Sequence, residues 1–175
     1  DKTFNDPRMP SDLLHLRDMS RASQLLRIAA SAFVTSQYEK GRDLFQRALV
    51  ACPSLASEHI DFTVDTLVYR IRGLSIDDPE EVLRQVTQYL PGENTFIKKL
   101  RHRMWGKFYE IAAFQAYQLG QRAECIRYVL RVAGQTPSSF RNRGLLSIFI
   151  RSLLGGQRTD EIKPLSINFQ MDDGR

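Results

Sequence analysis

Three acidic residues have the spacing of one helix face and are the first residues here that could do chemistry. Glu58, Asp61 and Asp65 are three and then four residues apart, so a helix through them would place their carboxylates on one side. Paired carboxylates can exchange protons with a substrate or bind a divalent cation. Because nothing in the sequence indicates a pocket around them, we favour a solvated acidic face and predict no catalytic residue.

The other residue types of enzyme chemistry are scattered. His15, His59 and His102 fall on separate expected helices, with no His or Cys at the spacing of metal ligands. No serine has identifiable His and Asp partners. Gly155 and Gly156 follow a helical pattern instead of opening one, which is typical of a helix end and not of a phosphate loop. We therefore predict a chain that is not an enzyme and uses no metal and no cofactor.

Two groups of cations could contact an anionic surface. The first is interleaved with Phe96 and Trp105, an arrangement that could bind phosphates and stack bases. These aromatic residues also fit the apolar side of a helix, which would leave the cations in water. The second group flanks the most apolar segment, which could lie on an anionic membrane or end a packed array, and we favour packing. The candidate anionic-surface contacts are Lys98, Lys99 and Arg101 in the first group and Arg141, Arg143 and Arg151 in the second.

Helices must position all of these residues, because apolar residues recur every three or four positions along most of the chain. The predicted helices run from Ser11 to about Thr35, from Tyr38 until Pro53, from about Glu58 to Arg72, from Pro79 until Pro91, from Asn94 or Thr95 to Gly120, onward until Gly134 and Pro137, and from Ser138 or Ser139 until Gly155. No strand is predicted with the helices, although the alternating residues Leu165, Ile167, Phe169 and Met171 could add a strand to a partner.

The segment from Phe96 to Pro137 organises the others. Two apolar stripes adjoin on its first helix, so we expect that helix to be covered on more than one side. The stripes are Ile97, Leu100, Met104, Phe108 and Ile111, and Trp105, Tyr109, Ala112, Ala116 and Leu119. Gly120 interrupts the pattern before a second amphipathic helix, and two antiparallel helices of this kind form the unit of a helical-repeat protein.

One pair of helices resembles the tetratricopeptide repeat. Counting back from Pro53, the residues Ala48, Phe45, Gly41 and Tyr38 occupy positions that this repeat fills with Ala, an aromatic residue, Ala or Gly, and Tyr. Counting back from Pro137, Val132, Val129 and Cys125 stand at the same intervals, and Gly120 lies two residues before the position that corresponds to Tyr38. The separation of the two prolines is not a multiple of the repeat length of about 34 residues, so we expect an irregular hairpin between them. The resemblance implies an all-α, tetratricopeptide-like right-handed array of about seven helices in antiparallel hairpins.

A second resemblance covers roughly residues 25–155. The run Asp77-Asp78-Pro79-Glu80, the helix from Trp105 to Gly120, and the run from Arg141 to Ile148 with Arg151 to Gly155 after it are similar to the helical region that follows the catalytic domain of some bacterial family 2 glycosyltransferases. The resemblance implies an accessory, C-terminal domain of a sugar-transferring enzyme, in the cytoplasm or at the inner face of the membrane. It does not imply that this chain transfers sugar, because the strands and acidic motif of a nucleotide-sugar domain are missing from the pattern.

Bulk properties agree with one helical domain. The length of 175 residues and the pattern of apolar positions predict a linker over 1–10, a helical domain over 11–156 and a flexible tail over 157–175. The formal net charge of +5 makes the surface mildly basic without identifying an anion. Cys52 and Cys125 fall in apolar helical patterns, and two cysteines make no disulfide framework, which favours a reducing, cytoplasmic location.

Two functions of different classes follow. The first is a scaffolding module whose inner helices bind a protein or peptide, with the partner-binding candidates Arg27, Ser31, Thr35, Arg103, Lys107, Glu110 and Gln115. The second is a regulatory, substrate-positioning or membrane-surface docking domain of a polysaccharide-synthesising enzyme, whose partner is the adjacent catalytic domain of the parent chain. Self-association and contact with an anionic membrane are further alternatives, and nucleic-acid binding is the least favoured.

Overall fold

A computed structural model describes residues 11–73, 78–92, 94–138 and 142–155, with side chains from residue 16 onward. These residues form seven α-helices and no strand. The helices are α1 (Ser11–Val34), α2 (Tyr38–Ala51), α3 (Ile60–Arg72), α4 (Pro79–Tyr89), α5 (Thr95–Gln118), α6 (Arg122–Gln135) and α7 (Arg143–Leu154). The predicted all-α fold is confirmed, and the expected linker over 1–10 and the tail over 157–175 lie outside the described residues.

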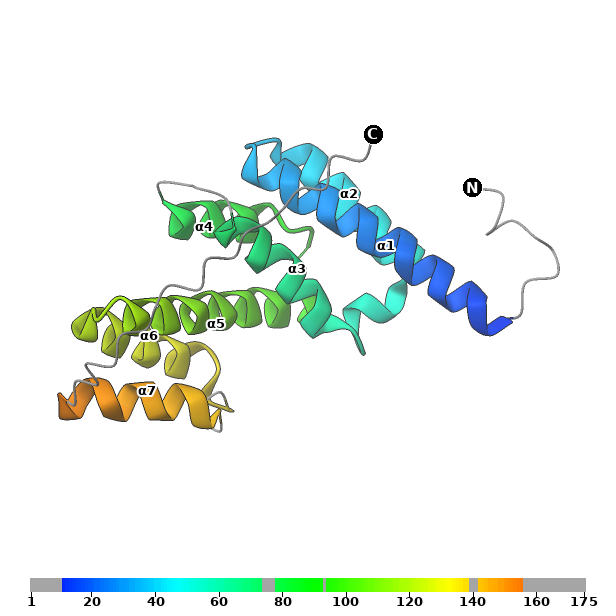
Figure 1. The fold of residues 1–175 in the computed structure, drawn as a ribbon. Helices are drawn as coiled ribbons and strands as arrows, with labels where there is room; N and C mark the ends of the chain where they lie inside the picture. Colours follow the sequence, from blue (N-terminus) through cyan, green and yellow to red (C-terminus); the bar gives the residue numbers. More distant parts are fainter. Residues whose placement is uncertain (1–10, 74–77, 93, 139–141, 156–175) are drawn as a thin grey trace, which may run out of the picture.

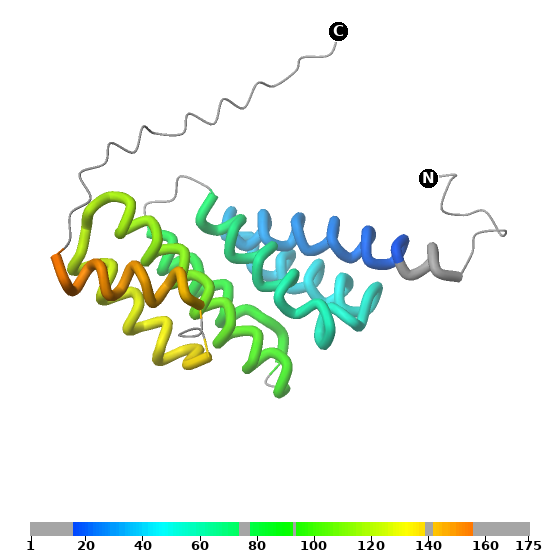
Figure 2. Tube along the Cα trace, turned by 60° about the horizontal axis from the view of Figure 1, so that its bottom comes forward, coloured from blue at the N-terminus to red at the C-terminus, as the bar shows by residue number. Residues whose placement is uncertain are grey.

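The helices form a row of antiparallel hairpins (Figure 1). The α1–α2 hairpin lies at one end, α3 and α4 occupy the middle, and α5 and α6 form the third hairpin. Helix α3 packs against both α1 and α5, and α7 packs on α5 and α6 at the far end. Figure 2 shows the same order from another side. This arrangement puts α1, α3 and α5 side by side, and the sites described below lie between them.

Helix α5 is covered on more than one side, as its two apolar stripes predict. It contacts α3, α6 and α7. Most members of both stripes are buried, including Met104, Phe108 and Tyr109. Leu119 differs from the expectation, because it lies just beyond the last turn of α5 and is 72% exposed. A stripe that is continuous in the sequence therefore leaves the protein interior where its helix ends.

Two glycines allow helices to approach closely. A Cβ atom built on Gly41 of α2 would lie 2.6 Å from the ring of Phe33 on α1, and both residues are buried. A Cβ atom on Gly106 of α5 would overlap the Oγ1 atom of Thr136, which follows α6. Small residues at these two positions therefore set the distances within the α1–α2 and α5–α6 hairpins.

Side chains cap several of the helices. Asp78 accepts a hydrogen bond from the backbone nitrogen of Glu81 (3.0 Å), and Pro79 occupies the first turn of α4. Asn94 caps α5 by accepting from the nitrogen of Ile97 (2.9 Å). These residues match the predicted helix starts because short polar side chains satisfy the first amide groups of a helix.

Two predicted helix starts are wrong. Helix α7 begins at Arg143 instead of Ser138 or Ser139, because Asn142 provides the cap and accepts a hydrogen bond from the Gly144 nitrogen (3.0 Å). Helix α3 begins at Ile60 instead of Glu58, because residues Pro53–Ala56 form a 3-10 turn, η2, that was not predicted. The buried Leu55 anchors this turn, and its carbonyl accepts from the Thr63 hydroxyl (3.3 Å).

Cys52 and Cys125 are buried and carry free thiols, in agreement with their place in the apolar patterns.

None of the helices in the described part of the chain has both the length and the apolar character that crossing a bilayer requires. The core is instead the shared interior of the stacked hairpins, where Phe33, Phe45, Leu67 and other large side chains are fully buried.

Candidate interaction grooves

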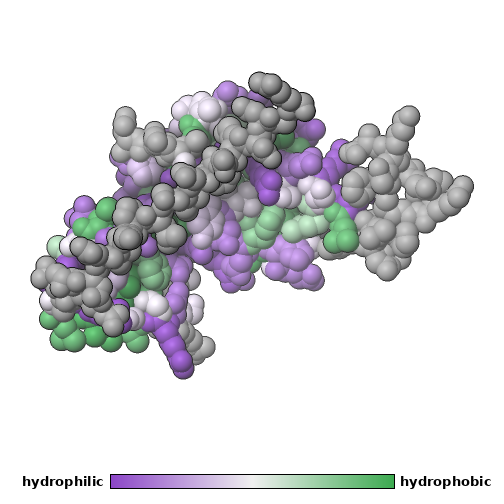
Figure 3. All heavy atoms as spheres, in the orientation of Figure 1, coloured by the Kyte–Doolittle hydropathy of each residue, from purple (hydrophilic) through white to green (hydrophobic). Residues whose placement is uncertain are grey.

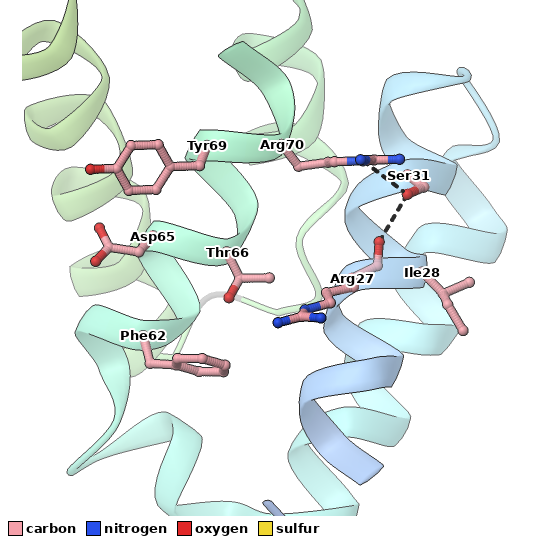
Figure 4. A pocket seen from close by; sticks show the side chains of 8 residues that line it. All are labelled: Arg27, Ile28, Ser31, Phe62, Asp65, Thr66, Tyr69 and Arg70. Atoms are coloured by element: carbon pink, nitrogen blue, oxygen red, sulfur yellow. Dashed lines mark hydrogen bonds between the residues drawn. The ribbon is translucent and has the colours of Figure 1, made fainter. Parts of the chain in front are cut away.

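One hollow between the helices is a groove between α1 and α3, with a volume of about 730 Å³. We refer to it as the α1–α3 groove, and Figure 4 shows its side chains projecting from the two helices. It is lined by Arg27, Ile28 and Ser31 of α1 and by Phe62, Asp65, Thr66, Tyr69 and Arg70 of α3. Its size is in the range of known ligand sites, which commonly measure about 300–1,000 Å³.

Apolar side chains of this groove face solvent. Ile28 is 51% exposed and Tyr69 is 53% exposed, and Phe62 is half-buried. Large apolar residues that stay accessible in a hollow can bury more surface when a partner binds. The groove therefore offers apolar area to a side chain from outside.

Cations lie beside this apolar area. The Nε atom of Arg70 donates to the hydroxyl of Ser31 across the groove (3.2 Å), and that hydroxyl donates to the backbone carbonyl of Arg27 (3.0 Å) (Figure 4). Among the described residues, neither arginine forms an ion pair, and the only carboxylate in the lining is that of Asp65. The terminal nitrogens of both guanidinium groups can thus donate to an incoming acceptor.

A second hollow of about 310 Å³ lies between α3 and α5, and we refer to it as the α3–α5 groove. It shares Asp65 with the α1–α3 groove and is also lined by Asp61, Val64, Arg103, Gly106, Lys107, Glu110, Thr136 and Ser138. Because Asp65 lines both, the two hollows follow one another across α3.

Charges in the α3–α5 groove are paired. Asp61 forms an ion pair with Arg103, and the Lys107 amine lies 3.4 Å from Asp65 and 4.0 Å from Glu110. Burial opposes the charge on Lys107, but the attraction of Asp65 and Glu110 outweighs it and raises the pKa of this lysine. The same amine lies 5.5 Å from the centre of the Tyr69 ring, within cation–π range.

The structure brings together five of the seven predicted partner-binding residues. Arg27 and Ser31 line the α1–α3 groove, while Arg103, Lys107 and Glu110 line the α3–α5 groove. Thr35 is exposed beyond the groove, and its hydroxyl donates to the carbonyls of Ser31 and Ala32. Gln115 lies in neither lining and accepts a hydrogen bond from Arg72.

The prediction missed the contribution of α3. Phe62, Thr66, Tyr69 and Arg70 line the α1–α3 groove, and they are separated by the helical intervals that put residues on one face. An aromatic pair seven residues apart, next to the buried face of the same helix, was the available signal. It was missed because only α1 and α5 were expected to form the inner surface.

The structure separates Glu58 from the other two acidic residues, Asp61 and Asp65. Asp61 and Asp65 share one face of α3, where both meet cations of α5. Glu58 precedes the first residue of α3 and is exposed, so the three carboxylates do not share a helix face. In the part of the chain that the structure describes, no group of three or more His, Cys, Asp or Glu side chains is arranged to hold a metal ion.

The candidate anionic-surface contacts do not form one patch. Lys98 and Lys99 are exposed near the start of α5, and Arg101 donates to the Leu90 carbonyl (3.4 Å). Arg143 and Arg151 are exposed on α7. Arg141 lies outside the described residues.

Comparisons with protein-family models, with curated proteins and with solved structures find no match to this chain.

Proposed function

We propose that this chain is a non-catalytic interaction module that binds an extended peptide segment of another protein in the α1–α3 groove. The observation that carries the proposal is the pairing of exposed apolar residues, Ile28 and Tyr69, with arginines at positions 27 and 70 in one hollow. Tyr and Arg are the residue types that contribute most often to binding at the centre of protein interfaces.

The lining defines the peptide. An aliphatic or aromatic side chain would cover Ile28, Phe62 and Tyr69, and a carboxylate next to it would accept hydrogen bonds from Arg27 and Arg70. The peptide would then extend over Asp65 toward the α3–α5 groove, where the charges already neutralise one another. We therefore expect preference for segments that combine one large apolar residue with Asp or Glu.

Selection from a displayed library of random peptides tests the proposal directly. The immobilised probe is the full 175-residue chain, and the enriched peptides are expected to carry the apolar–acidic combination. Tyr69→Ala is expected to weaken a selected peptide about 30-fold, the loss typical of a central interface residue. Arg27→Ala and Arg70→Ala each remove a charged donor and are expected to weaken binding about tenfold.

A matched control uses exposed residues of α2. Val50→Ala and Arg47→Ala change an apolar and a basic residue that line neither groove. Both should leave peptide affinity unchanged. Enriched peptides that bind the groove variants and the control variants equally well would refute the α1–α3 groove as the binding site.

The glycosyltransferase resemblance stays a prediction and suggests one source of the peptide. If the chain is the accessory region of such an enzyme, the segment in the groove belongs to the adjacent catalytic domain of the parent protein. Asn142 and Gly144 belong to the run from Arg141 to Ile148 on which this resemblance depends, and both take part in capping α7. Capping explains the presence of these two residues without any role in sugar transfer. A nucleotide-sugar domain encoded upstream of Asp1 would support the assignment, and an unrelated upstream sequence would contradict it.

A further inference from the structure

Helix α7 is apolar on two opposite sides. One side packs on α5 and α6 through Leu145, Ile148 and Ser152, which are buried. The other side faces solvent, where apolar residues recur at intervals of four, three and one. These residues are Leu146 (40% exposed), Ile150 (44%), Leu153 (57%) and Leu154 (79%). With 3.6 residues per turn, they form one face opposite the packed residues, and Figure 3 shows hydrophobic surface at this end of the molecule.

The end of α7 extends this face. A Cβ atom on Gly155 would lie 3.4 Å from a terminal nitrogen of Arg122, so the last turn of α7 meets the first turn of α6. Leu119 is three residues before Arg122 in the α5–α6 turn and is 72% exposed. Leu119 and Leu154 therefore belong to the same end of the stack, with a cation close by. We call the four apolar residues of α7 together with Leu119 the α7 face.

The charged side chains of α7 have one sign. Helix α7 contains Arg143 and Arg151 and no Asp or Glu, and both arginines are exposed. Neither forms an ion pair with another described residue. The acidic residue in the neighbouring turn of α6, Glu124, is already paired with Arg127. A partner of this face must therefore combine an apolar layer with negative charge.

A second copy of the chain does not meet that requirement. Two α7 faces in contact would bring Arg143 and Arg151 close to the same residues of the partner copy, with no carboxylate on either helix to pair with them. Like charges placed together in an interface oppose association. A bilayer with anionic headgroups does meet it, since it presents phosphates over an apolar layer, and short helices with leucines on one face and arginines beside it bind such surfaces.

We propose that the α7 face docks the chain on an anionic phospholipid bilayer. Helix α7 lies in the plane of the surface, with Leu146, Ile150, Leu153 and Leu154 at the boundary between headgroups and acyl chains. Arg143, Arg151 and Arg122 contact the phosphates. This site is separate from the α1–α3 groove and does not depend on peptide binding there.

Vesicle flotation of the full chain tests the proposal. The probes are phosphatidylcholine vesicles and vesicles of phosphatidylcholine mixed with phosphatidylserine. Binding is expected to the mixed vesicles only and to weaken as salt is added. Leu153→Asn with Leu154→Asn should reduce the partition coefficient at least tenfold, because two leucines no longer enter the apolar layer. Arg143→Gln with Arg151→Gln should reduce it about tenfold or more, since each arginine near an anionic surface contributes about fivefold.

Matched variants on α2 separate a local effect from a general one. Val50→Asn replaces an apolar residue that is 81% exposed, and Arg42→Gln with Arg47→Gln removes the same charge as the α7 double variant. These controls should bind the mixed vesicles like the parent chain, and circular dichroism should show unchanged helicity in all variants because every site is exposed. Failure to bind mixed vesicles, or equal binding to neutral ones, would overturn the proposal. So would light scattering that shows a dimer converted to monomer by the leucine variant while vesicle binding persists.

Discussion

The Nε atom of Arg70 on α3 lies 3.2 Å from the hydroxyl of Ser31 on α1 and donates a hydrogen bond to it. The bond spans the α1–α3 groove, and both residues line that groove. It orients the arginine side chain while leaving its terminal nitrogens able to bind another group. The polar part of the groove is in this sense prepared for an acceptor before one arrives.

Ser31 and Arg70 are expected to contribute little to the free energy of unfolding. Ser31→Ala and Arg70→Ala should each change the free energy of unfolding by less than about 1 kcal/mol, because exposed polar contacts contribute little. Leu55→Ala, which truncates a fully buried side chain, should cost about 2–5 kcal/mol. Urea denaturation followed by circular dichroism measures all three. A loss of several kcal/mol for Arg70→Ala would make the pair a structural connection instead of a binding element.

Substitution of Gly41 should destabilise the first hairpin. In Gly41→Ala the added methyl group would meet the buried ring of Phe33 at 2.6 Å, and the overpacking should cost about 1–3 kcal/mol. The matched control is Gly134→Ala in α6, where a Cβ atom would meet nothing within 4 Å. That change should stabilise the protein by about 0.5–1 kcal/mol through helix propensity. Equal effects of the two substitutions in thermal unfolding would contradict the close contact.

The environment of Tyr109 predicts that the folded protein becomes less stable at alkaline pH. Its hydroxyl donates to Glu80 (3.2 Å), and burial and the charge of Glu80 raise its pKa despite the opposing effect of Arg131. A raised pKa means that the folded state holds the phenol proton more tightly than the unfolded state. The resulting stability is present below the unfolded pKa of about 10 and is lost as the pH rises through the folded value.

The variant Tyr109→Phe removes that contribution. Its stability should therefore fall less than that of the parent chain between neutral pH and the alkaline range, and at neutral pH it should lose about 1 kcal/mol with the hydrogen bond. Tyr117→Phe removes another hydroxyl from α5 without touching the Glu80 contact and serves as the control. Parallel stability–pH curves for the parent and Tyr109→Phe would show that this tyrosine is not the group responsible.

The Asp65–Lys107 pair connects α3 to α5 and should couple weakly. The Asp65 side chain is 47% exposed and Lys107 is 27% exposed, so solvent screens much of the attraction. A double-mutant cycle with Asp65→Asn and Lys107→Met should give a coupling of about 0.5–1 kcal/mol that decreases with salt. If the coupling is near zero at low salt, the raised pKa of Lys107 must be attributed to Glu110 and not to Asp65.

Helix positions and buried faces could be predicted from the sequence because they depend on local spacing. Met104 and Phe108 follow the helical interval and are buried, and Gly41 fits the close contact expected of a small residue there. The start of α7 could not be predicted in this way. Ser138 and Asn142 are both suitable caps, and Asn142 also donates to Glu110 on α5 (2.9 Å), a tertiary contact that sequence spacing does not reveal.

The site was harder to predict than the fold. Arg27 and Lys107 were expected on the inner surface, but Tyr69 and Arg70 were not. A surface residue of a helix has no periodic signature that distinguishes a groove from open solvent, because the distinction depends on where the neighbouring helix lies. Leu119 shows the opposite error, since it continues an apolar stripe in the sequence yet is exposed after the helix ends.

The place of α3 in the stack has a consequence for how the protein comes apart. The α1–α2 hairpin meets the α5–α7 end mainly through α3, which packs on both α1 and α5. In arrays of this type stability is a sum of units and of the junctions between them, so melting of one middle helix uncouples two otherwise intact ends. Amide hydrogen exchange should then divide the chain into two cooperative blocks that open separately, with the boundary running along α3.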